Sequence, residues 1–307
     1  MIGKLEQIYI EGFSEDGENY SKYFCEKNIE FAVVYPKLNP VSAGYVIPKK
    51  LFNGKYCAYF SALATLREER GKGNAAALIN KMLVKASKDY AFAVLSPFNS
   101  EFYKKFGFFT TQYCTKSVVE GNEKYDLRLA KVEDLDCINN LFSKSVRPII
   151  DEEYLVALQE ETAMYNAVPV VVIKDDKIVG FCVKEKSSLS RVLTKEIAID
   201  KVGNFNGYTY KKNSVECDAF IQLRILSVVD FAKYLKAKRD FNIKIKVVDE
   251  IIFENNFVFE FNSVGTNLCV KMTENPHTVE VKIERLVEYL VENDYIEKFE
   301  TQFIDEY

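Results

Sequence analysis

Residues 63–75 read Leu-Ala-Thr-Leu-Arg-Glu-Glu-Arg-Gly-Lys-Gly-Asn-Ala and join an apolar strand, expected over residues 56–66, to an amphipathic helix. That helix carries apolar side chains at three- and four-residue spacings: Leu78, Ile79, Met82, Leu83 and Ala86. A glycine-rich turn at a helix N-terminus leaves backbone N–H groups available to an anion. The stretch therefore predicts a phosphate site, with a pyrophosphate favoured.

The residues of the turn suit that ligand. Arg70 and Lys72 supply positive charge, while Gly71 and Gly73 let the backbone approach where a Cβ would block it. The pattern is neither Gly-x-Gly-x-x-Gly nor a P-loop, because it has two glycines and Lys72 precedes the second of them. For these residues alone, a solvated surface turn that opens an ordinary helix is the alternative.

A second motif follows the helix. An apolar run over residues 90–95 predicts a buried strand, and residues 96–108 then read Ser-Pro-Phe-Asn-Ser-Glu-Phe-Tyr-Lys-Lys-Phe-Gly-Phe. Together the motifs resemble the GNAT acetyltransferases, whose Arg/Gln-x-x-Gly-x-Gly/Ala loop is matched by Arg70, Gly73 and Ala75. The aromatic helix that ends in Phe-Gly-Phe is also a GNAT element, and Tyr103 occupies the place of its tyrosine.

Both stretches are similar to the Eis (enhanced intracellular survival) family of N-acetyltransferases, over roughly residues 1–118. The resemblance implies acetyl-CoA as the co-substrate. Backbone groups of residues 63–65 would bind the pantetheine arm as an extra strand, and the turn would hold the pyrophosphate. The full set of cofactor-binding residues that it implies is Leu63, Ala64, Thr65, Arg70, Gly71, Lys72, Gly73, Asn74, Ala75, Phe98 and Asn99.

Two residues are expected to be catalytic. Tyr103 would protonate the departing thiolate, with core packing as the alternative for a chain of 19 Tyr and 23 Phe. The resemblance implies that the α-carboxylate of Tyr307 acts as the base, whereas a frayed terminus is the usual state of last residues. His277 is the one histidine and lies in an expected turn, so it is a poor candidate for a base; a hydrolase site anchored on another histidine and a metal site of several histidines are excluded, and no metal is expected.

The expected fold class is α/β followed by α+β, in three domains. Residues 1–122 would form the catalytic GNAT domain, with strands over 29–35, 44–48 and 56–66 and a hairpin turn at Asn53-Gly54. Residues 123–206 repeat the opening of a GNAT fold but lack a second phosphate turn, which predicts a truncated, non-catalytic copy. Residues 207–307 contain three alternating stretches, at 243–247, 257–261 and 268–272, and an amphipathic helix before the tail, which suits a sterol-carrier-like domain.

Bulk properties predict a cytoplasmic protein. The net charge of −4 and pI of about 5.5 provide no basic field for nucleic acid or a membrane surface. Seven scattered cysteines predict reduced thiols, and neither a signal peptide nor a membrane span is recognised. The expected partner is a small-molecule amine, and the sequence is compatible with either a monomer or a homo-oligomer.

The function expected is an acetyl-CoA-dependent N-acetyltransferase. By resemblance its acceptor would be a small cationic amine, such as a polyamine or an aminoglycoside, or a lysine side chain. Two alternatives remain at this stage. The C-terminal domain could bind a lipid or another small molecule with the GNAT domain as its scaffold, or the GNAT domain could sense CoA without turnover.

Overall fold

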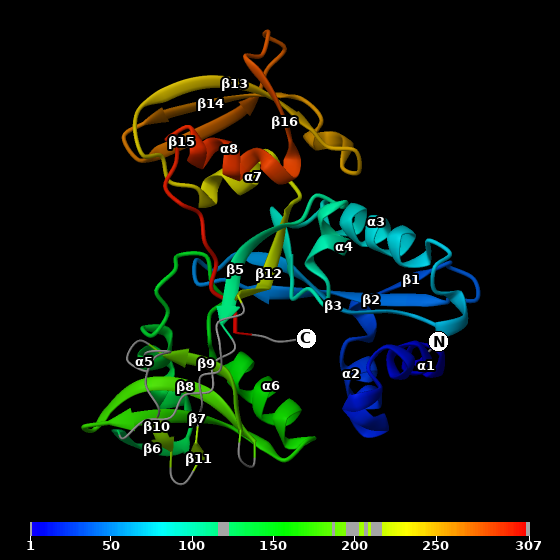
Figure 1. The fold of residues 1–307 in the computed structure, drawn as a ribbon, viewed down its shortest axis with the longest axis vertical. Coiled ribbons are helices and arrows are strands. Elements are labelled where there is room, and N and C mark those ends of the chain that lie inside the picture. Colours follow the sequence, from blue (N-terminus) through cyan, green and yellow to red (C-terminus); the bar gives the residue numbers. More distant parts are fainter. Residues whose placement is uncertain are drawn as a thin grey trace.

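The computed structural model describes residues 2–115, 123–185, 188–194, 203–205, 208–209 and 217–304 of the 307-residue chain (Figure 1). Three β-sheets follow one another along the long axis of the molecule, each with its own helices. The first sheet lies in the middle, with the second sheet below it and the third above it in this view.

The first sheet has six strands, in the order β1 (Ala32–Tyr35), β2 (Ser42–Lys50), β3 (Tyr56–Thr65), β4 (Phe92–Leu95), β12 (Cys217–Ile225) and β5 (Phe109–Thr115). The strands β3 and β4 are parallel neighbours and are joined by α3 (Asn74–Ala86), which confirms the expected strand–helix–strand unit. β1 is shorter than expected, since residues 29–31 form a turn of 3-10 helix.

Helices cover both faces of this sheet. The apolar stripe of α3 is fully buried, as the spacing of its residues predicts, and it packs with Ala58 and Phe60 of β3. On the opposite face lie α1 (Ile2–Gly12) and α2 (Gly17–Lys27), whose buried side chains pack with Ala62 and Ala64. The short helix α4 (Ser100–Lys104) precedes β5.

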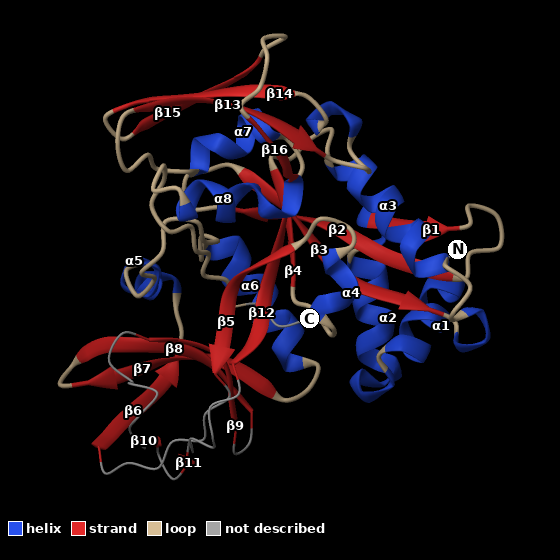
Figure 2. Ribbon diagram, turned by 45° about the horizontal axis from the view of Figure 1, so that its top comes forward, coloured by secondary structure: helices blue, strands red, loops and turns tan. Residues whose placement is uncertain are grey.

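The position of β12 corrects the expected grouping of residues 217–225 with the C-terminal domain. This strand lies between β4 and β5 and is antiparallel to both (Figure 2). Its apolar residues Ile221, Leu223 and Ile225 are fully buried, so their alternation fits an interior strand. The domain limits expected near residues 122 and 206 fall outside the described residues and stay predictions.

The second sheet is built from β11 (Tyr208–Thr209), β10 (Gly203–Phe205), β6 (Glu123–Leu129), β7 (Ala167–Lys174), β8 (Lys177–Glu185) and β9 (Ser188–Thr194), in that order. The expected hairpin of β7 and β8 is confirmed, with Asp175 and Asp176 at positive φ in its turn. The strands after β8 are additional to that expectation. Helices α5 (Leu135–Asn139) and α6 (Glu152–Ala163) pack on this sheet.

The third sheet has the order β15 (Asn267–Met272), β14 (Val258–Val264), β13 (Phe241–Val248) and β16 (Val279–Lys282). The expected antiparallel pairing holds for β13, β14 and β15, whereas β16 is parallel to β13. Ser227 caps α7 (Val228–Phe231) as expected, and α8 (Leu286–Glu292) forms the late amphipathic helix. The likeness to sterol carriers stays a prediction.

The chain returns to the first two sheets near its end. Phe303 and Ile304 are buried, and the backbone of Phe303 exchanges two hydrogen bonds with the Gln112 side chain of β5, at 2.7 and 2.9 Å. Ile304 belongs to the hydrophobic core of the second sheet, together with Leu155 and Leu158 of α6. The tail is therefore docked at least as far as Ile304.

A buried ion pair links three segments of the chain where the first sheet meets the third. Arg224 of β12 is 0% exposed, and its Nη2 donates to both carboxylate oxygens of Asp249, at 2.6 and 2.7 Å. Its Nε donates to the carbonyl oxygen of Phe106 at 2.7 Å. A Cβ on Gly107 would lie 2.7 Å from that Nε, so the Phe-Gly-Phe element is shaped to fit this guanidinium.

Asp249→Ala is expected to lower the free energy of unfolding by about 3–5 kcal/mol at pH 7, because it leaves the Arg224 charge buried without its partner. Burial opposes ionisation of Asp249, but the Arg224 charge and hydrogen bonds outweigh this and lower its pKa. The stabilisation is therefore present above the unfolded pKa and is lost as pH falls through the folded pKa. Urea unfolding at several pH values should show the gap to wild type narrowing in acid.

The control for this prediction is Glu26→Ala in α2. Glu26 and Lys22 lie 4.0 Å apart with side chains 56% and 65% exposed, so the loss of this pair should change stability by no more than about 0.5 kcal/mol. Equal losses in the two variants would contradict the assigned role of the buried pair.

Candidate functional site

The open end of the first sheet is made by β3 and β4. Their parallel pairing is confined to Ala58 with Ala93 and Tyr59 with Val94, although β3 continues to Thr65. Between Ala43–Tyr45 of β2 and Ser61–Ala64 of β3 the register shifts by one residue, and Ala62 has a φ of +49°. This bulge turns Ala62 and Ala64 toward α1 and α2, whereas Phe60 faces α3.

The glycine turn lies directly after this strand end. Gly71 and Gly73 have φ values of +76° and +83°, which glycine adopts without strain. No atom lies within 4 Å of a Cβ built on either residue, so the space in front of this backbone is open. Gly73 is the N-cap of α3, whose first N–H groups have no partner within the helix. The turn thus combines open space with the N–H groups of a helix N-terminus, an arrangement that can accommodate an anion.

Arg70 is placed differently from a simple phosphate ligand. Its Nε donates to the carbonyl oxygen of Thr65 at 3.0 Å, and its Nη2 donates to that of Glu11 at 2.8 Å. These bonds attach the turn to the end of β3 and to α1. Lys72 forms an exposed pair with Glu69 at 3.1 Å, and Asn74 donates to the carbonyl of Glu69 at 3.0 Å. Arg70 therefore shapes the turn through these two hydrogen bonds.

Tyr103 lies in the apolar cluster between α3 and the first sheet. It is 9% exposed and shares this cluster with Phe60 of β3 and Leu95 of β4, the strands that part at the open end. Its ring packs edge-on against Phe108 at 5.9 Å. Burial raises the pKa of Tyr103 to about 12, so the phenol is protonated at neutral pH.

The remaining residues expected at the site have varied positions. Leu63, Ala64 and Thr65 lie on β3 beyond its last pair with β4. Phe98 is fully exposed, whereas the side chain of Asn99 caps α4 by accepting from the backbone N–H groups of Glu101 and Phe102. Ala75 is half-buried in the first turn of α3.

Other expectations concern the tail and metals. Tyr307 lies outside the described residues, and its role stays a prediction. His277 is exposed and lies outside the helices and strands. Within the described ranges, no group of three His, Cys, Asp or Glu side chains could hold a metal ion.

A small aromatic pocket, which the sequence did not reveal, lies on the face of β3 opposite α3. It has a volume of about 190 Å³ and is walled by the rings of Tyr20, Tyr23, Phe24, Tyr59 and Tyr154. Ser61 of β3, next to the bulge, also lines it, as do Glu161 of α6 and Arg191 of β9. The pocket therefore combines the first sheet and α2 with the second sheet and its helix.

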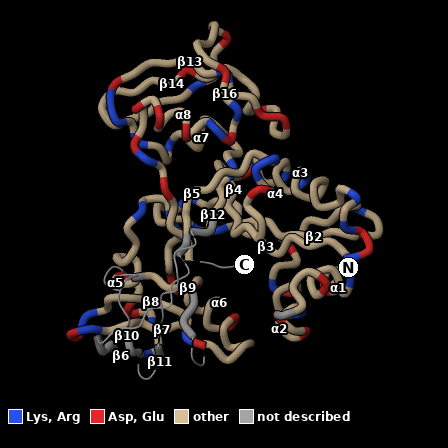
Figure 3. The backbone as a smooth tube through the Cα atoms, in the orientation of Figure 1, with Lys and Arg blue, Asp and Glu red and all other residues tan. Residues whose placement is uncertain are grey.

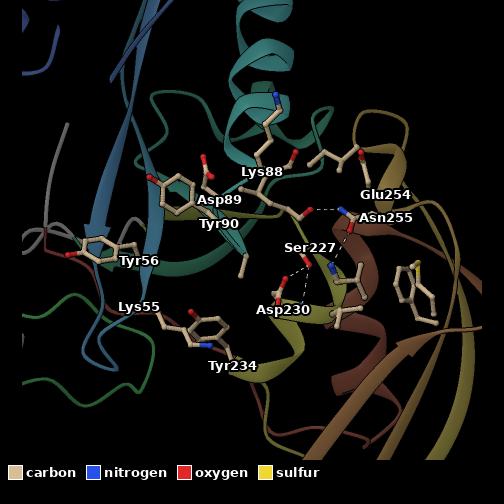
Figure 4. Close-up of a pocket in the computed structure, with 18 of the residues that line it drawn as sticks. Lys55, Tyr56, Lys88, Asp89, Tyr90, Ser227, Asp230, Tyr234, Glu254 and Asn255 are labelled. Atoms are coloured by element: carbon tan, nitrogen blue, oxygen red, sulfur yellow. Dashed lines mark hydrogen bonds between the residues drawn. The ribbon is translucent and has the colours of Figure 1, made fainter. Parts of the chain in front are cut away.

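A larger cavity, of about 1080 Å³, lies at the other end of β3 (Figure 4). Tyr56, the first residue of β3, and Tyr90, two residues before β4, lie across it from Asp230 and Asn255. The Ser227 hydroxyl accepts from the Asp230 N–H at 3.2 Å, and Asn255 Oδ1 accepts from Val228 at 3.0 Å. Despite its size, this cavity is separated from the bulge and the glycine turn by the length of β3.

Charges of both signs are interspersed along all three parts of the chain (Figure 3). None of the helices in the described ranges has the length and apolar character needed to cross a membrane.

The comparisons with known proteins identify the fold. No protein-family model matches the sequence, and no curated protein matches it. Among solved structures, a GCN5-related N-acetyltransferase from Anabaena variabilis superimposes with a TM-score of 0.70 at 15% identity, covering 100% of this chain and 97% of that one. A GCN5-related N-acetyltransferase from Kribbella flavida superimposes with a TM-score of 0.68 at 12% identity, covering 100% of this chain and 96% of that one.

Eis1 from Mycobacterium abscessus is also similar, with a TM-score of 0.57 and 13% identity over 87% of this chain and 84% of that one. The chain therefore has the fold of the GCN5-related N-acetyltransferases, and the resemblance expected from the two motifs is confirmed for the fold. The likeness extends over the whole chain and not only over the first sheet.

Arg70→Ala is expected to accelerate amide hydrogen exchange over residues 66–73 by about tenfold, because two hydrogen bonds that hold the turn are lost. Exchange followed by mass spectrometry measures this. Lys72→Ala is the neighbouring control, since its exposed pair contributes little and should leave exchange within about twofold of wild type. Equal acceleration in both variants would show that charge, and not the two bonds, orders the turn.

Proposed function

We propose that the chain is an acetyl-CoA-dependent N-acetyltransferase that acts on a primary amine. The observation that carries this proposal is the separation of β3 and β4 after two residue pairs, with a bulge in β3 and the N-terminus of α3 at the open end. An extended thioester can lie along the free edge of β3 while its phosphates meet the helix. The fold of the N-acetyltransferases supports the same assignment.

The residues at this end suit acetyl-CoA. Backbone groups of Leu63, Ala64 and Thr65 would pair with the pantetheine arm. The N–H groups of the turn from Gly71 to Ala75 would hold the pyrophosphate, because the space in front of Gly71 and Gly73 is open. The co-substrate supplies an acetyl group activated as a thioester.

In the reaction, the neutral amine nitrogen attacks the thioester carbonyl carbon, and the C–S bond then breaks. The sulfur leaves with the bonding electron pair and takes a proton, for which we assign the hydroxyl of Tyr103 as donor. The raised pKa of Tyr103 keeps this donor protonated at neutral pH. The proton lost by the nitrogen leaves through a base, for which the tail carboxylate of Tyr307 stays the candidate, and solvent restores the phenol.

If the chain were a CoA sensor or a scaffold for a binding domain, it would not convert acetyl-CoA to free CoA. Release of free thiol from acetyl-CoA in the presence of an amine separates these alternatives from the enzyme.

Gly73→Glu is expected to weaken acetyl-CoA binding by about a hundredfold or more, because a carboxylate would stand where phosphate oxygens approach the backbone. Isothermal titration with acetyl-CoA measures the change. Gly54→Glu is a matched control: Gly54 also has open space and a φ of +79°, but it lies in the turn between β2 and β3. The two substitutions carry similar backbone strain, so similar affinities would refute the assigned pyrophosphate site.

Tyr103→Phe is expected to lower kcat by about a hundredfold and to leave acetyl-CoA affinity nearly unchanged, because it removes the proposed proton donor and keeps the ring. The exposed Tyr113 of β5 provides the control variant Tyr113→Phe, which should turn over like wild type. If binding and rate fell together in Tyr103→Phe, the residue would serve packing, and an unchanged rate would mean that another group protonates the thiolate.

A further inference from the structure

The aromatic pocket opens beside the place where the thioester would lie. Ser61 belongs to the pocket wall, and the next residue, Ala62, belongs to the bulge of β3. The pocket and α3 lie on opposite faces of this strand, so a molecule in the pocket approaches the strand from the side that α3 leaves free. The pocket therefore offers a place for the acceptor of the proposed acetyl transfer.

The hydroxyl of Ser61 indicates an occupant for the pocket. Ser61 is 1% exposed, and its Oγ has no hydrogen-bond partner among the described residues. A buried hydroxyl without a partner is unfavourable, and native structures retain few such groups without a reason. A ligand nitrogen in the pocket would provide the missing partner beside the bulge.

The charged groups of the pocket are already engaged with one another or with rings. Glu161 Oε1 accepts from Arg191 Nη2 at 2.6 Å and from the Tyr20 hydroxyl at 3.3 Å. The Nζ of Lys49 lies 4.7 Å from the centre of the Tyr154 ring and 5.7 Å from that of Tyr59. Ring faces that attract cations thus already face a lysine, and the carboxylate already has a guanidinium.

The pocket therefore suits a ligand with one amine on an apolar group better than a polyamine with several ammonium groups. Five aromatic rings line the pocket together with the aliphatic side chains of Ile47, Ala157 and Leu158, and a volume of about 190 Å³ admits a compact group. A second ammonium group would meet Lys49 and Arg191 and would find Glu161 already paired. Transfer of an ammonium into such surroundings also favours its neutral form, which is the form that attacks a thioester.

We infer that the acceptor is a primary amine on a compact aromatic or apolar body, with one nitrogen and no further cationic groups. The amine N–H donates to Ser61 Oγ, which aims the nitrogen lone pair at the thioester carbonyl, and the body packs between the rings of Tyr59 and Tyr154. The bonds formed and broken are those of the proposed acetyl transfer, on which this inference rests. It departs from the multi-amine acceptors that the resemblance to the Eis family implies.

A comparison of two acceptors tests the substrate class. Thiol release by the full-length chain should give a kcat/KM for phenethylamine about tenfold or more above that for spermidine, because only the former matches the ring-lined wall. A spermidine value equal or higher would overturn the inference, while turnover with spermidine would leave the proposed acetyltransferase intact. Failure of acetyl-CoA to bind in calorimetry would refute the proposed function itself and the inference with it.

Variants of the wall test the placement. Tyr154→Ala should raise the KM for phenethylamine about tenfold with a smaller effect on kcat, because Tyr154 is half-buried and borders the body of the acceptor. Tyr56→Ala, at the far end of β3, is the control and should keep the wild-type KM. An unchanged KM in Tyr154→Ala would overturn the placement.

Ser61→Ala tests the nitrogen position. Removal of a buried hydroxyl that lacks a partner should not lower the melting temperature, and acetyl-CoA affinity should also persist. We expect kcat/KM for phenethylamine to fall by about tenfold, as for one lost hydrogen bond to the substrate. An unaltered kcat/KM would place the amine elsewhere, and restoration of the rate by Ser61→Thr would support the assigned contact.

Discussion

The guanidinium of Arg224 joins three segments that are far apart in the sequence. It lies on β12 and binds the carboxylate of Asp249, beyond the strand β13, and the carbonyl of Phe106, at the end of the aromatic motif. Asp249 in turn accepts from the N–H groups of Ile251 and Ile252. This charge pair lies at the junction with the third sheet. Because Arg224 holds the backbone of Phe106 and Gly107, directly after α4, the pair also fixes the position of Tyr103.

The bulge in β3 gives one strand two different tasks. Before Ser61 the strand alternates as usual, with Phe60 toward α3 and Tyr59 toward the other face. The extra residue then turns the small side chains of Ala62 and Ala64 toward α1 and α2, where Gly12 approaches so closely that its Cβ would lie 2.6 Å from that of Ala64. Ala62 and Ala64 therefore lie between Ser61, which lines the aromatic pocket, and the glycine turn that precedes α3.

Local patterns predicted the parts of the structure that local chemistry determines. The turn before α3 and the hairpins at Asn53-Gly54 and Asp175-Asp176 follow from glycine and from helical or alternating spacing. The place of β12 could not be predicted, because buried alternation at Ile221, Leu223 and Ile225 fits any interior position. The positive φ of Ala62 could not be predicted either, because alanine gives no indication of a left-handed backbone in the sequence. The pocket depends on α2, α6 and β9, which tertiary packing alone brings together.

The central place of β12 also affects the order in which this protein can fold. During synthesis, β4 and β5 leave the ribosome about a hundred residues before the strand that separates them, and β5 has no other strand partner among the described residues. Until then the nascent first sheet ends at β4 with an unpaired edge, which is an aggregation hazard. The second sheet, made by the intervening chain, can form in this interval. Folding of the region that holds the proposed site therefore has to wait for the rest of the molecule.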